Sequence, residues 1–419
     1  MAYDQRGALT LLCKVRKIGR VNCQSSAKYY RRRRIAAGGV AAIVIAGAAG
    51  CGVGLQKLTG WTAQEWQPHA STTESAGPST PAQAVPRLKK EHAPKIAPVV
   101  RDSHNAAPLN DAPKPGKQGT VTFESAGATR SAIIHVPQSA AQGRPMPLIL
   151  AFHGYGEGPK TMAKYAGLNG AWGDTGTQEA LVVYPAGLNK AWEGAPYSTS
   201  KPGQDVRFIR ELLDALSATY AIDGNRVYSV GMSNGGGFAV MLACEMPEQF
   251  AAIASVSGAY YPDTWASCAT AQSNAKDPSS IRFVPGTPIP FLEIHGRRDE
   301  TIKYNGGRRH DTAYVSAMRL SSLFAGRSGC FGAPHSVAVT DKITRVAWSD
   351  CQAGAEVMHL GIDDGGHTWM GDDRGLAGTG EAQAGSKSLT TRKSERTTRV
   401  ITATEEVLAF FERHRRVVG

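Results

Sequence analysis

The sequence predicts an α/β fold with a mostly parallel central sheet flanked by helices, and three observations indicate it. Apolar runs of strand length alternate with amphipathic stretches of helix length from about residue 119 onward. The run 148–152 is continuously apolar, as expected of a strand covered on both faces. The run Gly-Met-Ser-Asn-Gly at 231–235 stands between a strand candidate and a helix candidate, which indicates a sharp turn from strand to helix.

The expected elements follow in chain order. An antiparallel pair at 121–123 and 132–136 opens the sheet. Further strands are expected at 148–152, 181–184, 226–230, 252–256, 290–294 and 356–362, and helices at 205–220, 237–244 and 402–414. The long stretches 259–288 and 303–350 are read as loops that partly cover a site.

The turn at 231–235 carries the chemistry. A strand, G-x-S-x-G and a helix in this order form the nucleophile elbow of an α/β-hydrolase fold. Glycine is needed at 231 and 235 because a Cβ there would collide with the neighbouring strand and helix. Ser233 then projects at the amino end of a helix, whose dipole favours a developing negative charge. We expect Ser233 to be a nucleophile.

A base and an acid follow the serine in the order that this fold uses. Asp299 comes after the strand candidate at 290–294, and His367 comes after the last strand, between glycines and Trp369. His367 is expected to take the proton of Ser233, and Asp299 to orient the imidazole. His310 is the alternative base, and Glu300 is adjacent to the expected acid.

The oxyanion and the substrate need further groups. One backbone donor is expected from Asn234, and a second from the Gly-rich loop 153–158, where Tyr155 is preferred and its two glycine neighbours are alternatives. Trp192 and Trp369 are expected to form an apolar wall for an acyl or aryl group. For Trp192, packing within its loop is an equal alternative.

Four cysteines fall in the expected catalytic region: Cys244, Cys268, Cys330 and Cys351. An even count in an exported protein suggests disulfides, with three pairings open. Proximity in the chain favours Cys244–Cys268 and Cys330–Cys351. Neither C-x-x-C nor H-E-x-x-H spacing occurs, so we expect no metal and no cofactor.

Charge is concentrated at the start of the chain. Residues 1–34 hold ten Lys and Arg against one Asp, which is +9 of the formal net charge of +12, so we expect no nucleic-acid partner. The uncharged run 35–50 is shorter than the roughly 20 residues of a membrane span. Residues 1–51 are therefore read as an export leader. Cys51 follows small residues and is a lipidation candidate, the alternative being a plain or uncleaved leader.

The segment 52–118 is rich in Pro, Ala, Ser and Thr and is expected to be a disordered tether. Residues 119–419 form the expected catalytic domain. This organisation predicts a protein outside the cell, in the periplasm or in the cell envelope, with membrane attachment through Cys51 or the leader as the open alternatives.

The motifs resemble a known family. The runs 231–237, 294–299, 304–307 and 365–369 are similar to those of the polyhydroxybutyrate depolymerase family, which includes lipoprotein esterases of the LpqC type and is related to feruloyl and acetylxylan esterases. The resemblance implies an α/β-hydrolase fold, a Ser-Asp-His triad and hydrolysis of carboxylic esters without a metal. Ala191, Met370 and the insertion 371–399 depart from the family pattern near the site mouth.

Several readings of the function stay open. The ester could be a polyester, a feruloyl or acetyl group on a polysaccharide, or a small soluble ester. Transfer of the acyl group to an alcohol or sugar in the cell envelope is a second chemistry on the same fold. A non-catalytic surface binding protein on a hydrolase scaffold is the alternative from another class.

Overall fold

The computed structural model describes residues 106–170, 179–274, 276–277, 279–371 and 400–416. The chain divides into two units, 1–85 and 86–419, and all described residues lie in the second. The expected leader 1–51, Cys51 and most of the expected tether therefore lie outside the described residues. Leu109 is buried and its backbone N–H donates to Thr219, so the folded domain begins before residue 119. Among the described residues, no helix has the length and apolar character to cross a bilayer.

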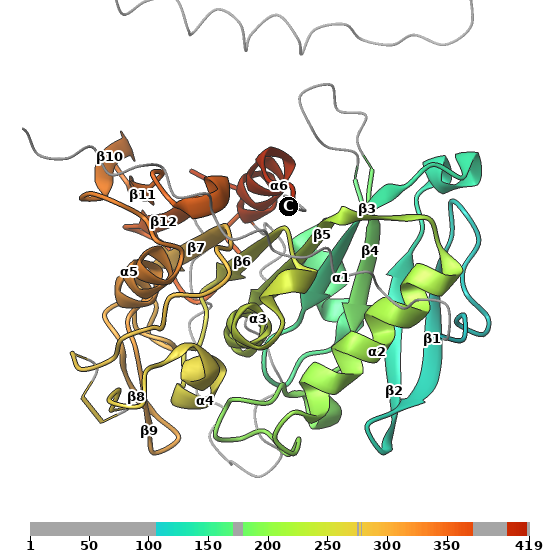
Figure 1. Cartoon of the computed structure of the whole chain (residues 1–419), viewed down its shortest axis with the longest axis horizontal. Helices are drawn as coiled ribbons and strands as arrows, with labels where there is room; N and C mark the ends of the chain where they lie inside the picture. The colour runs from blue at the N-terminus through green and yellow to red at the C-terminus, as the bar shows by residue number, and fades with distance from the viewer. Residues whose placement is uncertain (1–105, 171–178, 275, 278, 372–399, 417–419) are drawn as a thin grey trace, which may run out of the picture. The chain divides into compact units, whose positions relative to one another are not determined.

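A single ten-stranded sheet organises this unit, with parallel strands at its centre (Figure 1). Parallel pairing joins β4, β3, β5, β6, β7 and β12, and antiparallel pairing joins β1 and β2 to one side and β11 and β10 to the other. The strand order is β1-β2-β4-β3-β5-β6-β7-β12-β11-β10. The strands are β1 (Gln118–Ser125), β2 (Ala128–His135), β3 (Met146–Phe152), β4 (Leu181–Pro185), β5 (Ile222–Met232), β6 (Ala252–Val256), β7 (Phe291–Gly296), β10 (His335–Thr340), β11 (Ile343–Trp348) and β12 (Val357–Ile362).

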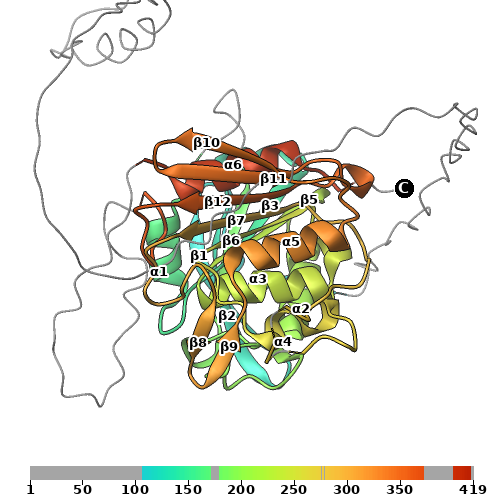
Figure 2. The same cartoon turned by 90° about the vertical axis from the view of Figure 1, so that its left-hand side faces the viewer.

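Helices cover both faces of the sheet. The helices α2 (Gln204–Thr219), α3 (Asn234–Glu245) and α5 (Ala317–Arg327) lie together on one side (Figure 2) and share one apolar core. The helices α1 (Pro159–Ala166) and α6 (Ala403–Arg413) contribute to a second core. The alternation of β3 explains the two cores, because Leu148, Leu150 and Phe152 belong to the first and Ile149 and Ala151 to the second. This is the expected α/β-hydrolase fold. The continuously apolar run of β3 is the feature of the sequence that predicts its central sheet most directly.

The stretch 303–350, expected to be a covering loop, is largely regular structure. It contains the small hairpin of β8 (Gly307–Arg309) and β9 (Thr312–Tyr314), then α5, β10 and β11. The expectation was wrong because it missed α5, whose buried residues Leu320, Leu323 and Phe324 recur at helical spacing. The Ser316 side chain caps this helix by accepting a hydrogen bond from the Arg319 N–H. All six residues of β10 are exposed, so it lacks the alternation typical of a half-buried strand. The stretch 259–288 holds only the short α4 (Pro262–Trp265) and a 3₁₀ turn (Ala266–Cys268).

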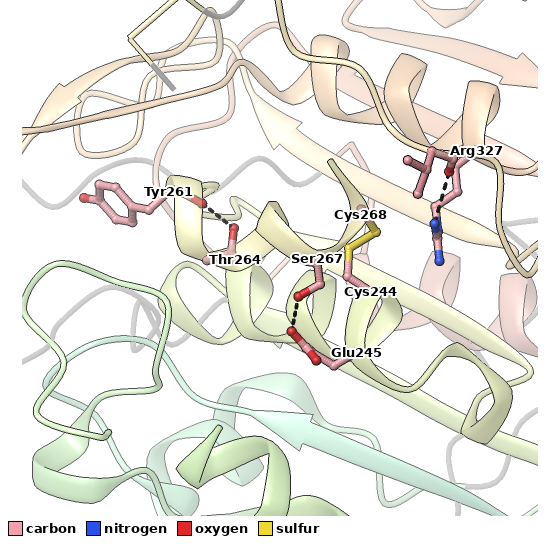
Figure 3. Close-up of a disulfide and its surroundings, with 8 residues drawn as sticks. Cys244, Glu245, Tyr261, Thr264, Ser267, Cys268 and Arg327 are labelled. Atoms are coloured by element: carbon pink, nitrogen blue, oxygen red, sulfur yellow. Dashed lines mark hydrogen bonds between the residues drawn. A yellow bond between two sulfur atoms is a disulfide. The ribbon is translucent and has the colours of Figure 1, made fainter. Parts of the chain in front are cut away.

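Two disulfides cross-link segments that pack in or against the first core. Cys244, at the end of α3, is bonded to Cys268, which follows α4 (Figure 3). In the same region the Thr264 hydroxyl donates to the Tyr261 carbonyl at 2.7 Å, closing the turn of α4. The second disulfide joins Cys330, after α5, to Cys351, after β11. Of the three pairings that the sequence left open, the structure has the one that proximity favoured.

Candidate active site

Three loops at the carboxyl end of the sheet bring Ser233, Asp299 and His367 together. They follow β5, β7 and β12 respectively, which are strands of the parallel part of the sheet. The Nε2 atom of His367 lies 2.9 Å from the Oγ of Ser233. The Nδ1 atom of His367 lies 2.8 Å from Oδ2 of Asp299. All three residues are buried, with 9 % or less of their surface exposed.

The backbone at Ser233 has the strained form expected of an elbow. Its φ of +55° and ψ of −117° lie outside the regions that serine ordinarily adopts. The conformation is held because the Ser233 carbonyl accepts hydrogen bonds from the N–H groups of Gly237 and Ala259. A Cβ at Gly231 would lie 2.1 Å from the Gly235 carbonyl oxygen, and one at Gly235 would lie 2.2 Å from that of Phe152. Both glycines are therefore required by close approach of the backbone.

The loop after β3 presents a backbone N–H beside this elbow. The Gly154 N–H donates to Glu157 at 3.0 Å, and the Gly156 N–H donates to the Lys190 carbonyl at 2.9 Å. Within the described part of the chain, the Tyr155 N–H has no acceptor. The Asn234 N–H is the first of α3, a position whose amides have no intrahelical partner. The two glycine alternatives are thus occupied, which leaves Tyr155 and Asn234 as the candidate donors.

His153 fixes the shape of that loop. Its Nδ1 lies 2.8 Å from the Gly154 carbonyl, and its Nε2 accepts the Gly187 N–H at 3.1 Å. Complete burial lowers the pKa of His153 to about 4, so the ring is neutral at physiological pH. A neutral ring with its proton on Nδ1 satisfies both contacts, which gives His153 a structural role.

The two tryptophans expected to line a substrate wall are buried instead. Trp192 has no exposed surface, stacks on Phe238 at 4.8 Å between ring centroids, and donates its indole N–H to the His153 carbonyl. Trp369 is 1 % exposed and its indole N–H donates to Thr404. Because both rings are packed and their polar atoms are satisfied, the expectation of an accessible wall was wrong. The alternative of loop packing holds for Trp192.

An aromatic rim, consisting of Tyr155, Tyr197 and His310, stands next to the loop after β3. The ring centroids of Tyr155 and Tyr197 are 4.1 Å apart, and those of Tyr197 and His310 are 4.8 Å apart. Tyr155 keeps 39 % of its surface exposed. The sequence analysis did not find this rim, because its members come from three loops far apart in the chain and carry no common motif.

Asp299 is surrounded by donors. Its Oδ1 accepts the N–H groups of Thr301 and Ile302 at 2.9 and 2.7 Å. Its Oδ2 lies 2.8 Å from Nδ1 of His367 and 3.2 Å from Nε2 of His295. Burial alone would raise the pKa of Asp299, but the charge of His367 and the hydrogen bonds from both histidines outweigh it and hold that pKa well below its usual range. Asp299 is therefore ionised.

The sequence analysis assigned no role to Glu293 or His295, and the structure makes them part of a buried polar network behind Asp299. A signal was present in the strand, because residues 293 and 295 share one face of β7 and come just before the loop that carries Asp299. Within the described residues, no group of three His, Cys, Asp or Glu is arranged to hold a metal ion.

Comparison with known proteins finds similarity to esterases. Residues 124–317 match the family model described as "Putative esterase". The chain is 28 % identical over 319 residues to "Putative esterase NocK" of Nocardia uniformis subsp. tsuyamanensis, covering 71 % of this chain and 83 % of that protein. It is 27 % identical over 261 residues to "Feruloyl esterase D" of Neurospora crassa, covering 59 % and 77 %.

Among solved structures, an acetyl xylan esterase from Aspergillus awamori aligns over 59 % of this chain and 94 % of its own, with 17 % identity and a TM-score of 0.38. The fold assignment rests on the strand order and the position of the elbow rather than on this alignment.

Proposed function

We propose that this chain, a carboxylic ester hydrolase whose residues 124–317 match the esterase family, works by a serine mechanism through Ser233, His367 and Asp299. The observation that carries the proposal is the continuous line of contacts Ser233 Oγ–His367 Nε2 and His367 Nδ1–Asp299 Oδ2, at 2.9 and 2.8 Å. Both distances are within hydrogen-bond reach, which a nucleophile and its base require.

In the proposed reaction, Ser233 Oγ attacks the ester carbonyl while Nε2 of His367 takes its proton. The tetrahedral oxyanion is held by the backbone N–H groups of Asn234 and Tyr155. The intermediate collapses, the leaving alcohol receives the proton from His367, and an acyl-serine remains. Water then attacks the acyl-serine with His367 again as base, which releases the acid and regenerates Ser233.

Asp299 supports this cycle without transferring a proton. Its ionised carboxylate accepts the Nδ1–H of His367, which leaves Nε2 unprotonated and facing Ser233. The same negative charge stabilises the imidazolium that forms when Ser233 attacks.

For the ester itself, the motif resemblance favours a hydroxybutyrate polyester. A second candidate is a feruloyl or acetyl ester of a polysaccharide, and the aromatic rim favours it. Aromatic faces bind planar acyl groups and sugar rings through apolar contact. The exposed Tyr155 ring belongs to the residue proposed to supply an oxyanion donor, so the rim lies beside the reacting carbonyl.

We also propose that the protein acts outside the cytoplasm. Two disulfides in the described domain support this, because such bonds persist in oxidising compartments. Lipidation at Cys51 is tested by metabolic labelling with palmitate. Label on the wild type that disappears in Cys51→Ala supports it, and equal absence from both removes it.

The test of the proposed function is a hydrolysis panel with the full-length protein. It contains p-nitrophenyl acetate, butyrate and octanoate, methyl ferulate, acetylated xylan and hydroxybutyrate oligomers. We expect turnover that Ser233→Ala reduces by at least about 10⁴-fold. Retained activity in a folded Ser233→Ala variant contradicts the mechanism. Products that change on adding an acceptor alcohol indicate acyl transfer. No turnover from a folded protein that a fluorophosphonate labels indicates a transferase or an ester outside the panel, and no labelling either indicates the binding-protein alternative.

A further inference from the structure

The line of contacts proposed for catalysis continues behind Asp299. Nε2 of His295 lies 3.2 Å from Oδ2 of Asp299, the same oxygen that faces His367. Nδ1 of His295 lies 2.9 Å from Oε1 of Glu293. Ser233, His367, Asp299, His295 and Glu293 therefore form one chain of polar contacts from the elbow into β7.

This extension is shut off from solvent. The side chains of Glu293 and Asp299 have no exposed surface and that of His295 has 1 %. A buried charge costs several kcal/mol unless it is paired, so these groups must satisfy one another. Glu293 has two further partners: Tyr260 donates its hydroxyl at 2.9 Å, and His359 on β12 places Nδ1 at 2.6 Å from Oε2. The parallel register sets residues 359 and 293 side by side.

The hydrogen bonds of His295 determine its protonation. Nε2 faces two acceptors, the Ile302 carbonyl at 2.8 Å and the Asp299 carboxylate, so it carries a proton. Nδ1 faces Glu293, and an ionised carboxylate can only accept, so Nδ1 carries a proton as well. Both ring nitrogens are then donors, and His295 is an imidazolium between two carboxylates.

Tyr304 and Arg297 are further titratable and charged groups near His295. The Tyr304 ring packs at 6.0 Å between centroids and hydrogen-bonds Nε2 of His359, and the Arg297 guanidinium lies over its face. Burial alone would lower the pKa of His295, but the Glu293 charge and the hydrogen bonds that His295 donates to Asp299 and Glu293 raise that pKa to about 10. Burial alone would raise the pKa of Glu293, but the charges of His295 and His359 outweigh this effect and lower that pKa to about 2.

We propose that His295 is a positioning residue, a buried imidazolium that shares Oδ2 of Asp299 with His367 and so limits the negative charge that His367 experiences. The proposal rests on the triad of the proposed function. The consequence is electrostatic: Oδ2 of Asp299 faces a cation on one side and His367 on the other, so the cation offsets part of the carboxylate charge at His367. Glu293 is the counter-charge that keeps the cation in place.

The first test is the pH profile of kcat/KM for His295→Gln in the full-length protein. Glutamine keeps a donor but has no charge, so the Asp299 carboxylate would act on His367 without the offsetting cation. We expect the acid limb of the profile to move up by about one pH unit, with activity on the plateau lowered by less than about tenfold. The matched control is His335→Gln on exposed β10, which should leave the profile unchanged.

A merely structural role predicts a different result, in which His295→Gln lowers the rate by the same factor at every pH. That outcome, with the thermal unfolding of the variant showing a folded protein, overturns the proposal while leaving the serine mechanism intact. Loss of the serine mechanism is reported separately by retained activity in Ser233→Ala.

The second test reads the protonation of His295 in the wild-type protein directly. Nitrogen NMR of ¹⁵N-histidine-labelled full-length protein reports whether each ring nitrogen carries a proton. We expect one histidine, identified as His295 by its loss in His295→Gln or by coupling within β7, to keep both nitrogens protonated from pH 6 to 9. A single protonated nitrogen on His295 in this range overturns the proposal, whatever the kinetics show.

Discussion

At the scale of single residues, the site depends on Ser233 being held in a backbone conformation that serine rarely adopts. The φ of +55° is maintained by three backbone hydrogen bonds, two to the Ser233 carbonyl and one from its N–H to Val256. This geometry places Oγ against His367, and the strain is distributed over a turn that two glycines allow to be tight. The groups proposed to react are therefore pre-positioned by the fold.

Asp299→Asn tests the orienting role of the acid. An amide can donate toward Nδ1 of His367 and so favours the tautomer that carries its proton on Nε2, where it no longer accepts from Ser233. We expect kcat to fall by about 10³- to 10⁴-fold with little change in KM. Steady-state kinetics on p-nitrophenyl butyrate check this. Asp363→Asn, which changes an exposed partner of Arg297, is the control and should stay within about twofold of wild type.

Gly235→Ala tests the close packing of the elbow. The added methyl would lie 2.2 and 2.6 Å from the carbonyl oxygens of Phe152 and His153, so backbone must move. We expect a loss of about 3 kcal/mol in the free energy of unfolding, with loss of activity. Gly326→Ala is the control, because that glycine is helical with open space around it. The control should gain about 0.5–1 kcal/mol. Equal effects in the two variants would contradict the packing argument.

At the scale of elements, what the sequence could predict follows from how each element is stabilised. The strand β3 and the helix α2 were predicted correctly because their buried residues form recognisable patterns in the sequence. In β3 the pattern is a continuous apolar run, and in α2 it is apolar residues at helical spacing. The strand β10 was not found because all its side chains face solvent. The helix α5 was hidden in a stretch read as loop, although its Ser316 cap is a local signal.

The candidate site likewise contains residues that sequence patterns reveal and contacts that they do not. Ser233, Asp299 and His367 were located because each follows a recognisable strand and the chain order is diagnostic of the fold. The contact of His295 with Asp299, and the assembly of Tyr155, Tyr197 and His310, depend on how distant loops fold against one another. No spacing in one sequence reports such contacts. Trp192 failed as a substrate wall for the same reason, since its burial depends on Phe238 in α3.

The disulfide between α3 and the turn after α4 has a testable contribution to stability. Cys244 and Cys268 are 24 residues apart, and a cross-link over a loop of this length stabilises by about 3 kcal/mol through the unfolded chain. We expect the double variant Cys244→Ala/Cys268→Ala to lose about that much. Urea unfolding measures it, with the second disulfide, Cys330–Cys351, left intact in both proteins. A loss below about 1 kcal/mol would contradict this prediction.

At the scale of the whole molecule, the buried ionisable groups predict how stability depends on pH. The pKa of His295 is raised from 6.5 to about 10, so between these values the folded protein keeps a proton that the unfolded chain releases. Raising the pH through this range therefore favours unfolding. The pKa of His153 is lowered from 6.5 to about 4, so below pH 6.5 the unfolded chain takes up a proton that the folded protein excludes.

We therefore expect the Tm to be highest near pH 6–7 and to fall toward both pH 5 and pH 9. Calorimetry of wild type and His295→Gln over this range checks the assignment. In the variant the alkaline fall should be shallower and the acid fall retained, since His153 is unchanged. An alkaline fall of equal steepness in the variant would show that His295 does not hold the extra proton.

The most direct measurement of the central claim is to label the full-length protein with a fluorophosphonate and map the adduct by mass spectrometry. The serine mechanism predicts one stoichiometric adduct on Ser233, formed at a rate that His367→Ala reduces by several orders of magnitude. An adduct on another residue, or no adduct on a folded protein that still hydrolyses esters, would contradict it.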